Sequence, residues 1–155
     1  MVTKIEFQES FADALFELIE LEYDAVDAYE SAVERIQDYY YKTQLEDFKE
    51  DHYRHIKQFS ALLESHEYQH PTGPSEKQWL LKGKVIPAKL LGDETILKAM
   101  KSNKIDTNVA YERIQDREDV WKDARVLINQ GMHDEKRHKA WLEEAIKNPH
   151  DEEIL

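Results

Sequence analysis

The sequence contains no cysteine, and it has only 4 glycines and 4 prolines in 155 residues. Without cysteine there are no disulfides, thiolate ligands or thiol nucleophiles, so a metal would have to be bound by oxygen and nitrogen atoms. The shortage of glycine and proline argues against a sandwich or barrel rich in tight turns. No segment approaches the roughly 18 apolar residues of a membrane span. We therefore expect a soluble, cytoplasmic, helical protein with no membrane partner.

Basic residues are also in deficit, with 21 Lys and Arg against 33 Asp and Glu and a formal net charge of -12. The average field of such a chain repels the phosphates of nucleic acid and of anionic membranes, so we expect no nucleic-acid partner. The length lies near the commonest size of one domain. The sequence thus predicts a single domain over residues 1–155.

Apolar side chains recur every three to four residues in four long segments, which is the spacing of amphipathic helices. Each segment begins near a residue that can cap a helix, namely Ser10, Thr43 and Asp93 for the first three. The second segment ends before the proline-glycine cluster 71–74, and the fourth ends before Pro149. The predicted helices span residues 10–38, 43–67, 93–115 and 119–147.

Residues 75–91 are apolar and basic, and we expect them to form a connecting helix that bends near Pro87. A helix of this length covers about 25 Å at 1.5 Å per residue, enough to carry the chain back along the length of a bundle. The third helix would then start beside the start of the second. The predicted topology is two antiparallel hairpins joined by a long helical crossover.

The chain repeats itself at a nearly constant interval. The segment Asp24–Glu30 (DAVDAYE) resembles Asp106–Glu112 (DTNVAYE), 82 positions later. The segment Asp51–His55 (DHYRH) resembles Asp134–His138 (DEKRH), 83 positions later. Near-equal intervals indicate that the two hairpins are copies of one unit, packed with approximate two-fold symmetry. The middle of the bundle is then the natural place for a shared site.

Six ionisable side chains interrupt the apolar stripes instead of lying opposite them. Burying such groups is costly unless they bind a metal or pair with one another. Four of them form two pairs, and the members of each pair are three residues apart, which places both on one helix face. The six residues are Glu22, His52, His55, Lys104, Glu135 and His138.

Two of these patterns carry a family resemblance. The motif Glu135-x-x-His138 resembles half of the di-iron signature of the ferritin-like superfamily, which includes rubrerythrins and bacterioferritins. Glu22, seven residues before Tyr29, is similar to the metal ligand and nearby tyrosine of the first bacterioferritin helix. Over nearly its whole length the chain resembles small bacterial ferritin-like proteins of unassigned function.

The resemblance implies an all-α, ferritin-like four-helix bundle that binds iron. It also implies a homo-oligomer, with a dimer as the simplest form, and an iron-dependent oxidoreductase or a protein that handles iron and peroxide. Whether the protein is an enzyme stays open at this point.

Compared with the family pattern, this sequence has two departures. The family places one Glu on each of two helices and Glu-x-x-His on each of the other two. Four residues match this pattern, but His52 and Lys104 stand where the family has Glu. An imidazole is still a metal ligand, whereas an ammonium repels a cation. The four matching residues are Glu22, His55, Glu135 and His138.

Two interpretations follow from these departures. In the first, the four matching residues hold one ion of Fe(II), Mn(II) or Zn(II), with His52 as a fifth ligand. In the second, no metal is bound, because Lys104 is itself the cation between Glu22 and Glu135 in a structural or interaction protein. Either arrangement balances the buried charges, and the sequence leaves both open.

Four further residues lie near the predicted centre. Tyr29 and Tyr111 suit electron transfer or a bond to a ligand carboxylate, although aromatic residues on a helix stripe more often serve core packing. Glu30 and Glu112 lie about 80° round the helix from the stripe, so we expect them in solvent, with a ligand role only if a helix is rotated.

Overall fold

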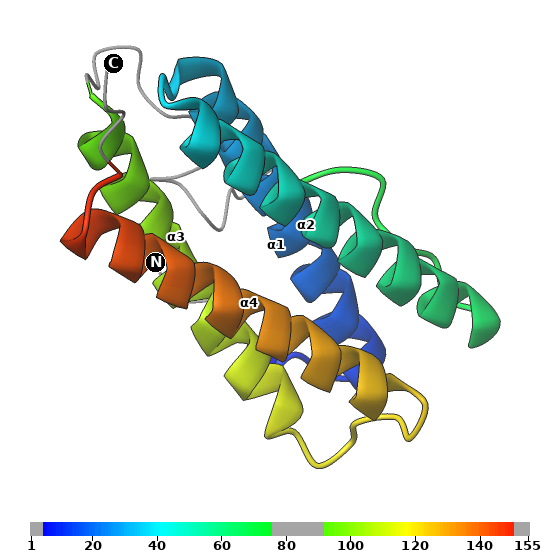
Figure 1. The fold of residues 1–155 in the computed structure, drawn as a ribbon. Helices are drawn as coiled ribbons and strands as arrows, with labels where there is room; N and C mark the ends of the chain where they lie inside the picture. The colour runs from blue at the N-terminus through cyan, green and yellow to red at the C-terminus, as the bar shows by residue number, and fades with distance from the viewer. Residues whose placement is uncertain (1–4, 76–91, 151–155) are drawn as a thin grey trace.

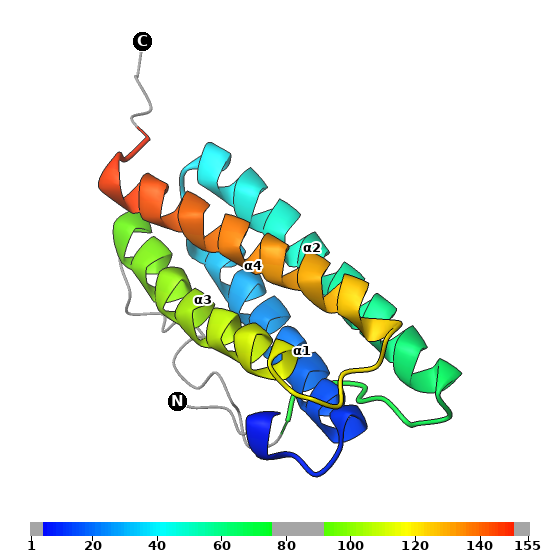
Figure 2. The same ribbon diagram turned by 90° about the horizontal axis from the view of Figure 1, so that it is seen from below.

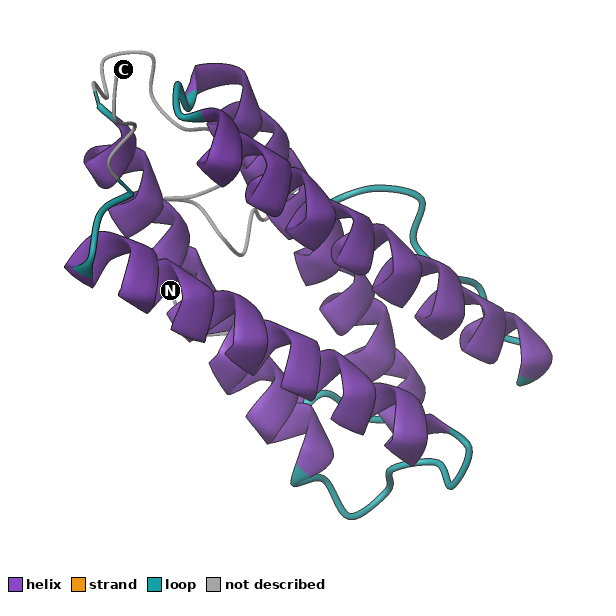
Figure 3. Ribbon diagram, viewed as in Figure 1, coloured by secondary structure: helices purple, strands orange, loops and turns teal. Residues whose placement is uncertain are grey.

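The computed structural model describes residues 5–75 and 92–150, and every regular element within these ranges is helical (Figure 3). A short 3-10 helix, η1 (Ile5–Phe7), precedes the long helices. The predicted all-α fold is confirmed, while the helix expected over residues 75–91 lies outside the described residues. The long helices are α1 (Phe11–Arg35), α2 (Tyr39–Ser65), α3 (Asp93–Gln115) and α4 (Ala124–Lys147).

The four helices form two antiparallel hairpins packed side by side (Figures 1 and 2). The most extensive contacts join α1 to α2 and α3 to α4, and the hairpins meet through α1 against α3 and α2 against α4. The pairs α1–α4 and α2–α3 are therefore diagonal. In this square arrangement all four helices contribute side chains to one central axis.

Capping decides where the first two helices begin. The Ser10 side chain accepts a hydrogen bond from the backbone N–H of Asp13 at 3.1 Å, as predicted. The second helix starts at Tyr39, earlier than predicted, because Asp38 caps it by accepting from the Tyr41 N–H at 3.2 Å. Thr43 lies inside the helix and donates to the carbonyl of Tyr39. The first helix ends at Arg35, before the predicted residue 38, because Ile36 has an extended backbone (φ -68°, ψ 137°).

The start of α3 is tied to the turn between α1 and α2. Asp93 was expected to cap α3, but that position belongs to Gly92, whose φ of 87° favours glycine. The Asp93 carboxylate instead accepts the backbone N–H groups of Gln37 and Asp38 at 2.8 and 2.9 Å. This bond confirms that the third helix starts beside the start of the second.

The last helix begins at Ala124, later than the predicted position 119. The preceding loop is held by Arg117, which pairs with Asp119 at 2.8 Å. The same guanidinium donates to the backbone carbonyls of Ile5 and Gln8, both at 2.9 Å. These contacts join the loop to the N-terminal segment. They favour the loop conformation, so α4 does not begin one turn earlier.

The core consists of two apolar clusters separated by a polar layer. One cluster includes Leu18 and Phe59, and the other includes Phe48 and Met100. On α2, α3 and α4 the ionisable residues predicted to face inward lie between the parts that enter the two clusters, while Glu22 on α1 lies near the end of the stretch that enters the first cluster. The polar layer thus crosses the bundle near its middle, shielded from water at both ends.

None of the described helices combines the length and apolar character needed to cross a membrane.

Gly131 of α4 packs directly against the ring of Tyr111. A Cβ atom at this position would lie 2.6 Å from Tyr111 Cε1 and 2.7 Å from its hydroxyl oxygen. We predict that Gly131→Ala destabilises the protein by about 1–3 kcal/mol, because overpacking outweighs the roughly 1 kcal/mol by which alanine favours a helix. Urea unfolding measures this change. Gly73→Ala is the control, since no atom lies within 4 Å of its Cβ position, and equal stability of the two variants would contradict the prediction.

Candidate metal centre

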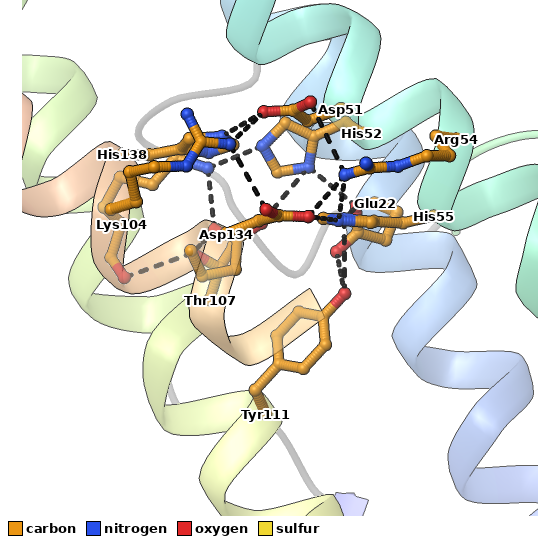
Figure 4. A network of polar contacts seen from close by, with 12 residues as sticks. Glu22, Asp51, His52, Arg54, His55, Lys104, Thr107, Tyr111, Asp134 and His138 are labelled. Atoms are coloured by element: carbon orange, nitrogen blue, oxygen red, sulfur yellow. Dashed lines mark hydrogen bonds and ion pairs between the residues drawn. The ribbon is translucent and has the colours of Figure 1, made fainter. Parts of the chain in front are cut away.

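The six inward ionisable residues meet in the middle of the bundle, and Figure 4 labels all of them except Glu135. Glu22 comes from α1, His52 and His55 from α2, Lys104 from α3, and Glu135 and His138 from α4. All six are at most 2% exposed. Their charges lie where water cannot solvate them. Each must therefore be compensated by a neighbour.

Glu22 is held by three donors. Its Oε2 atom lies 2.7 Å from His52 Nδ1 and 3.1 Å from His55 Nδ1, and its Oε1 accepts from the Tyr111 hydroxyl at 2.8 Å. Burial alone would raise the pKa of Glu22, but the two histidines hold it well below its usual value. Glu22 is thus a buried anion that binds two imidazoles through one oxygen.

Glu135 is held from the opposite side by Lys104. The Lys104 ammonium donates to Glu135 Oε2 at 2.8 Å and to His52 Nε2 at 2.7 Å, and the Thr107 hydroxyl donates to the same Glu135 oxygen at 2.9 Å. Burial opposes ionisation of Glu135, but the charge of Lys104 keeps its pKa below the ordinary value. No hydrogen bond from the described residues reaches Glu135 Oε1.

A reciprocal set of ion pairs joins α2 to α4 beside this centre. Asp51 accepts from Arg137 at 2.7 Å and from His138 Nε2 at 2.8 Å. Asp134 accepts from Arg54 and, at 2.7 Å, from His55 Nε2. Each repeat motif therefore supplies an aspartate to the histidine and arginine of the other, as the proposed two-fold relation requires.

His55 and His138 occupy equivalent positions, yet their pKa values move in opposite directions. Burial disfavours the protonated form of both rings. For His55 the negative charge of Glu22 outweighs this effect and raises its pKa to about 9. For His138 the bond to Asp51 does not offset burial and the positive charge of Lys104, and its pKa falls to about 4. The sign of the charge at positions 22 and 104 separates the two rings.

The side chains best placed to share a metal ion differ from the predicted set in one residue. Glu22, His52, His55 and Glu135 each offer a ligand atom, and these atoms all lie within 4.8 Å of one another. The sequence had His138 among the main ligands and His52 as an extra one. His138 lies outside this group. Its Nε2 is directed at Asp51, and its buried Nδ1 has no partner among the described residues.

Tyr29 and Tyr111 line the centre, while Glu30 and Glu112 do not. Tyr111 bonds Glu22, and the Lys104 ammonium lies 4.8 Å from the centre of the Tyr29 ring, over its face. Burial raises the pKa of both tyrosines well above the ordinary value. Glu30 and Glu112 are exposed, as expected.

Sequence reasoning missed the roles of Asp51, Asp134 and Thr107. Both aspartates are the first residues of the repeated motifs, so the repeat did contain a signal for them. Their cross-pairing was not readable, because it depends on how closely α2 and α4 approach. Thr107 follows Lys104 by three residues on the apolar stripe of its helix, a position that gives no signal of a polar role.

No protein-family model matches the sequence, and no curated protein matches it. A solved structure does. It is the crystal structure of a ferritin-like, diiron-carboxylate protein from Bacillus anthracis str. Ames, and the match covers 94% of this chain and 99% of that one, with a TM-score of 0.68 at 16% sequence identity. The chain has a ferritin-like fold. At 16% identity this match shows the fold alone. The chemistry of the centre has to be inferred from the residues of this chain.

The opposite shifts of His55 and His138 predict a stability maximum near pH 6.5 for the metal-free protein. His55 is stabilised in its protonated form, so its contribution is complete below pH 6.5 and is lost as the pH rises through about 9. His138 stays neutral when folded, so stability falls as the pH drops from 6.5 toward 4 and the unfolded chain takes up a proton. Each change is on the order of 3 kcal/mol.

Free energies of unfolding in urea with a chelator, measured between pH 4.5 and 9.5, test this profile. His138→Gln removes one titrating group, and we expect it to flatten the profile between pH 6.5 and 5. A wild-type protein that gains stability between pH 6.5 and 5 would rule out the assigned states.

Proposed function

We propose that this protein is a ferritin-like metal protein that binds one divalent transition-metal ion at Glu22, His52, His55 and Glu135. The observation that carries the proposal is the meeting of four buried ligand atoms from three helices within 4.8 Å. The solved structure with the similar fold is that of a ferritin-like, diiron-carboxylate protein, which supports iron as the first candidate.

The donor set fits one ion. Two imidazoles and two carboxylates suit Fe(II), Mn(II) and Zn(II). Ligand atoms about 2.1 Å from one ion are at most about 4.2 Å apart, so a maximum spacing of 4.8 Å needs only small side-chain rotations. Glu135 Oε1, which is buried, receives no hydrogen bond from the described residues and lies 3.4 Å from His52 Nδ1, is a carboxylate donor for such an ion.

The same residues do not fit two ions. The centre has the carboxylates Glu22 and Glu135, where a di-iron site of this fold uses four. In addition, the Lys104 ammonium already binds one oxygen of Glu135. A second divalent ion here would meet a positive charge and too few anions.

The surrounding residues orient the donors. Tyr111 holds one oxygen of Glu22, Thr107 and Lys104 hold one oxygen of Glu135, and Asp134 holds the outer nitrogen of His55. Bonds of this kind fix ligands before a metal arrives. The apolar clusters above and below keep bulk water away.

Iron at this site would supply one-electron chemistry toward O2 or peroxide, which makes an iron-dependent oxidoreductase the proposed activity. The expected setting is the cytoplasm, since a reducing compartment suits both a ferrous ion and a chain without cysteine. A homodimer remains the expected assembly.

We predict one metal ion per chain after anaerobic loading with Fe(II), measured by elemental analysis of the desalted protein. Glu22→Gln should lower metal affinity by at least about 10- to 100-fold, because it removes the anion shared by both imidazoles. Glu30→Gln, an exposed change on the same helix, is the matched control and should bind like wild type. A folded wild-type protein without bound metal after loading would exclude the proposal.

A second candidate function is a metal-free structural or interaction protein. The specific observation in its favour is that Lys104 is itself a buried cation in contact with Glu135 and His52. Lys104 and protonated His55 then balance the two buried carboxylates without any ion. The centre would serve to define one packing of the bundle.

For this second candidate we predict that Lys104→Met lowers the free energy of unfolding by about 3–5 kcal/mol in chelator, because Glu135 loses its buried partner. Lys98→Met removes an exposed pair with Glu94 on the same helix and should cost no more than about 1 kcal/mol. Metal-free wild-type protein together with this large loss would favour the second candidate, while a small loss would contradict it.

A further inference from the structure

The two halves of the centre correspond residue by residue. Glu22 on α1 corresponds to Lys104 on α3, since the repeats place them 82 positions apart, and His52 and His55 on α2 correspond to Glu135 and His138 on α4. The reciprocal bonds of His55 to Asp134 at 2.7 Å and of His138 to Asp51 at 2.8 Å show that the relation holds in three dimensions. The centre is therefore two half-sites with different side chains.

The half-site around Glu22 has its donors engaged. His52 Nδ1 and His55 Nδ1 both lie against Glu22 Oε2, at 2.7 and 3.1 Å. In the absence of a metal these contacts use every inward ligand atom of this half. A cation that binds here would replace the contacts of the two histidines with Glu22 Oε2.

The half-site around Lys104 has donors left over. His138 Nδ1 is buried and has no hydrogen-bond partner among the described residues, and Glu135 Oε1, which the proposed function gives to the first ion, receives no hydrogen bond but lies 3.4 Å from His52 Nδ1. Buried polar atoms of this kind are rare in folded proteins and call for an explanation. A carboxylate oxygen and an imidazole nitrogen are two of the three donors that a metal half-site of this fold requires.

The third donor is replaced by a cation. At the position equivalent to Glu22 stands Lys104, whose ammonium lies 2.8 Å from Glu135 Oε2. It provides no ligand atom while protonated, and its charge repels a second ion. We infer that Lys104 closes a second metal half-site formed by positions 104, 135 and 138, and so limits the centre to one ion. This inference deepens the proposed function and rests on it for the first ion.

Metal stoichiometry tests the inference without reference to activity. Wild-type protein, Lys104→Glu and Lys104→Met are equilibrated anaerobically with Co(II) and analysed for metal per chain. Lys104→Glu supplies the missing carboxylate, so the expected value rises from one to two. Lys104→Met removes the charge but supplies no ligand, so it should stay at one. His138→Ala in the Lys104→Glu background should return the value to one.

A new buried carboxylate can impair folding, so Lys104→His is the second variant. It adds a neutral ligand in place of the cation, and we expect it also to bind two ions. Circular dichroism checks that each variant is helical before loading. If neither folded ligand-bearing variant exceeds one ion, or if Lys104→Met reaches two, the inference is overturned.

The same data separate this inference from the proposed function. Wild-type protein with no metal and Lys104→Glu with two ions would refute the proposed function but support the closing role of Lys104. No metal in either protein would overturn both. One ion in both would leave the proposed function intact and overturn the inference alone.

Discussion

Two carboxylates that cannot reach water, Glu22 and Glu135, determine the chemistry of the bundle centre. In a low-dielectric interior each must be matched by positive charge or by strong donors. Glu22 is matched by two imidazoles and a phenol, and Glu135 by an ammonium and a hydroxyl. The apolar clusters on both sides make this matching compulsory. The functional question is therefore which cation these carboxylates accept.

The ion pairs between the two repeated motifs are symmetric, but the side chains at the centre that they surround are not. The aspartates, arginines and histidines of the two motifs cross-pair in the same way on both sides. Inside this frame of ion pairs the two halves differ at Glu22 against Lys104 and at His52 against Glu135, and the pKa of His55 is raised to about 9 while burial and Lys104 lower that of His138 to about 4. A repeated helical frame can thus keep its geometry while the charges at its centre differ.

Much of the fold could be predicted from the sequence because helices depend on local patterns. Ser10 capped its helix as expected, and the four long helices were found in order. The errors came at helix ends, one of which another segment controls. Thr43 lost the cap to Asp38, and Asp93 bonds the turn of the other hairpin and does not cap its own helix. Such contacts between hairpins leave no local trace.

The candidate site divides in the same way. The sequence by itself determined which ionisable residues face inward, because helical periodicity sets the direction of a side chain from its own helix alone. Only the tertiary structure decided their partners: that His52 and not His138 joins Glu22, His55 and Glu135, and that Lys104 lies between Glu135 and His52. Those outcomes depend on the heights and rotations of four helices relative to one another. No single helix contains that information.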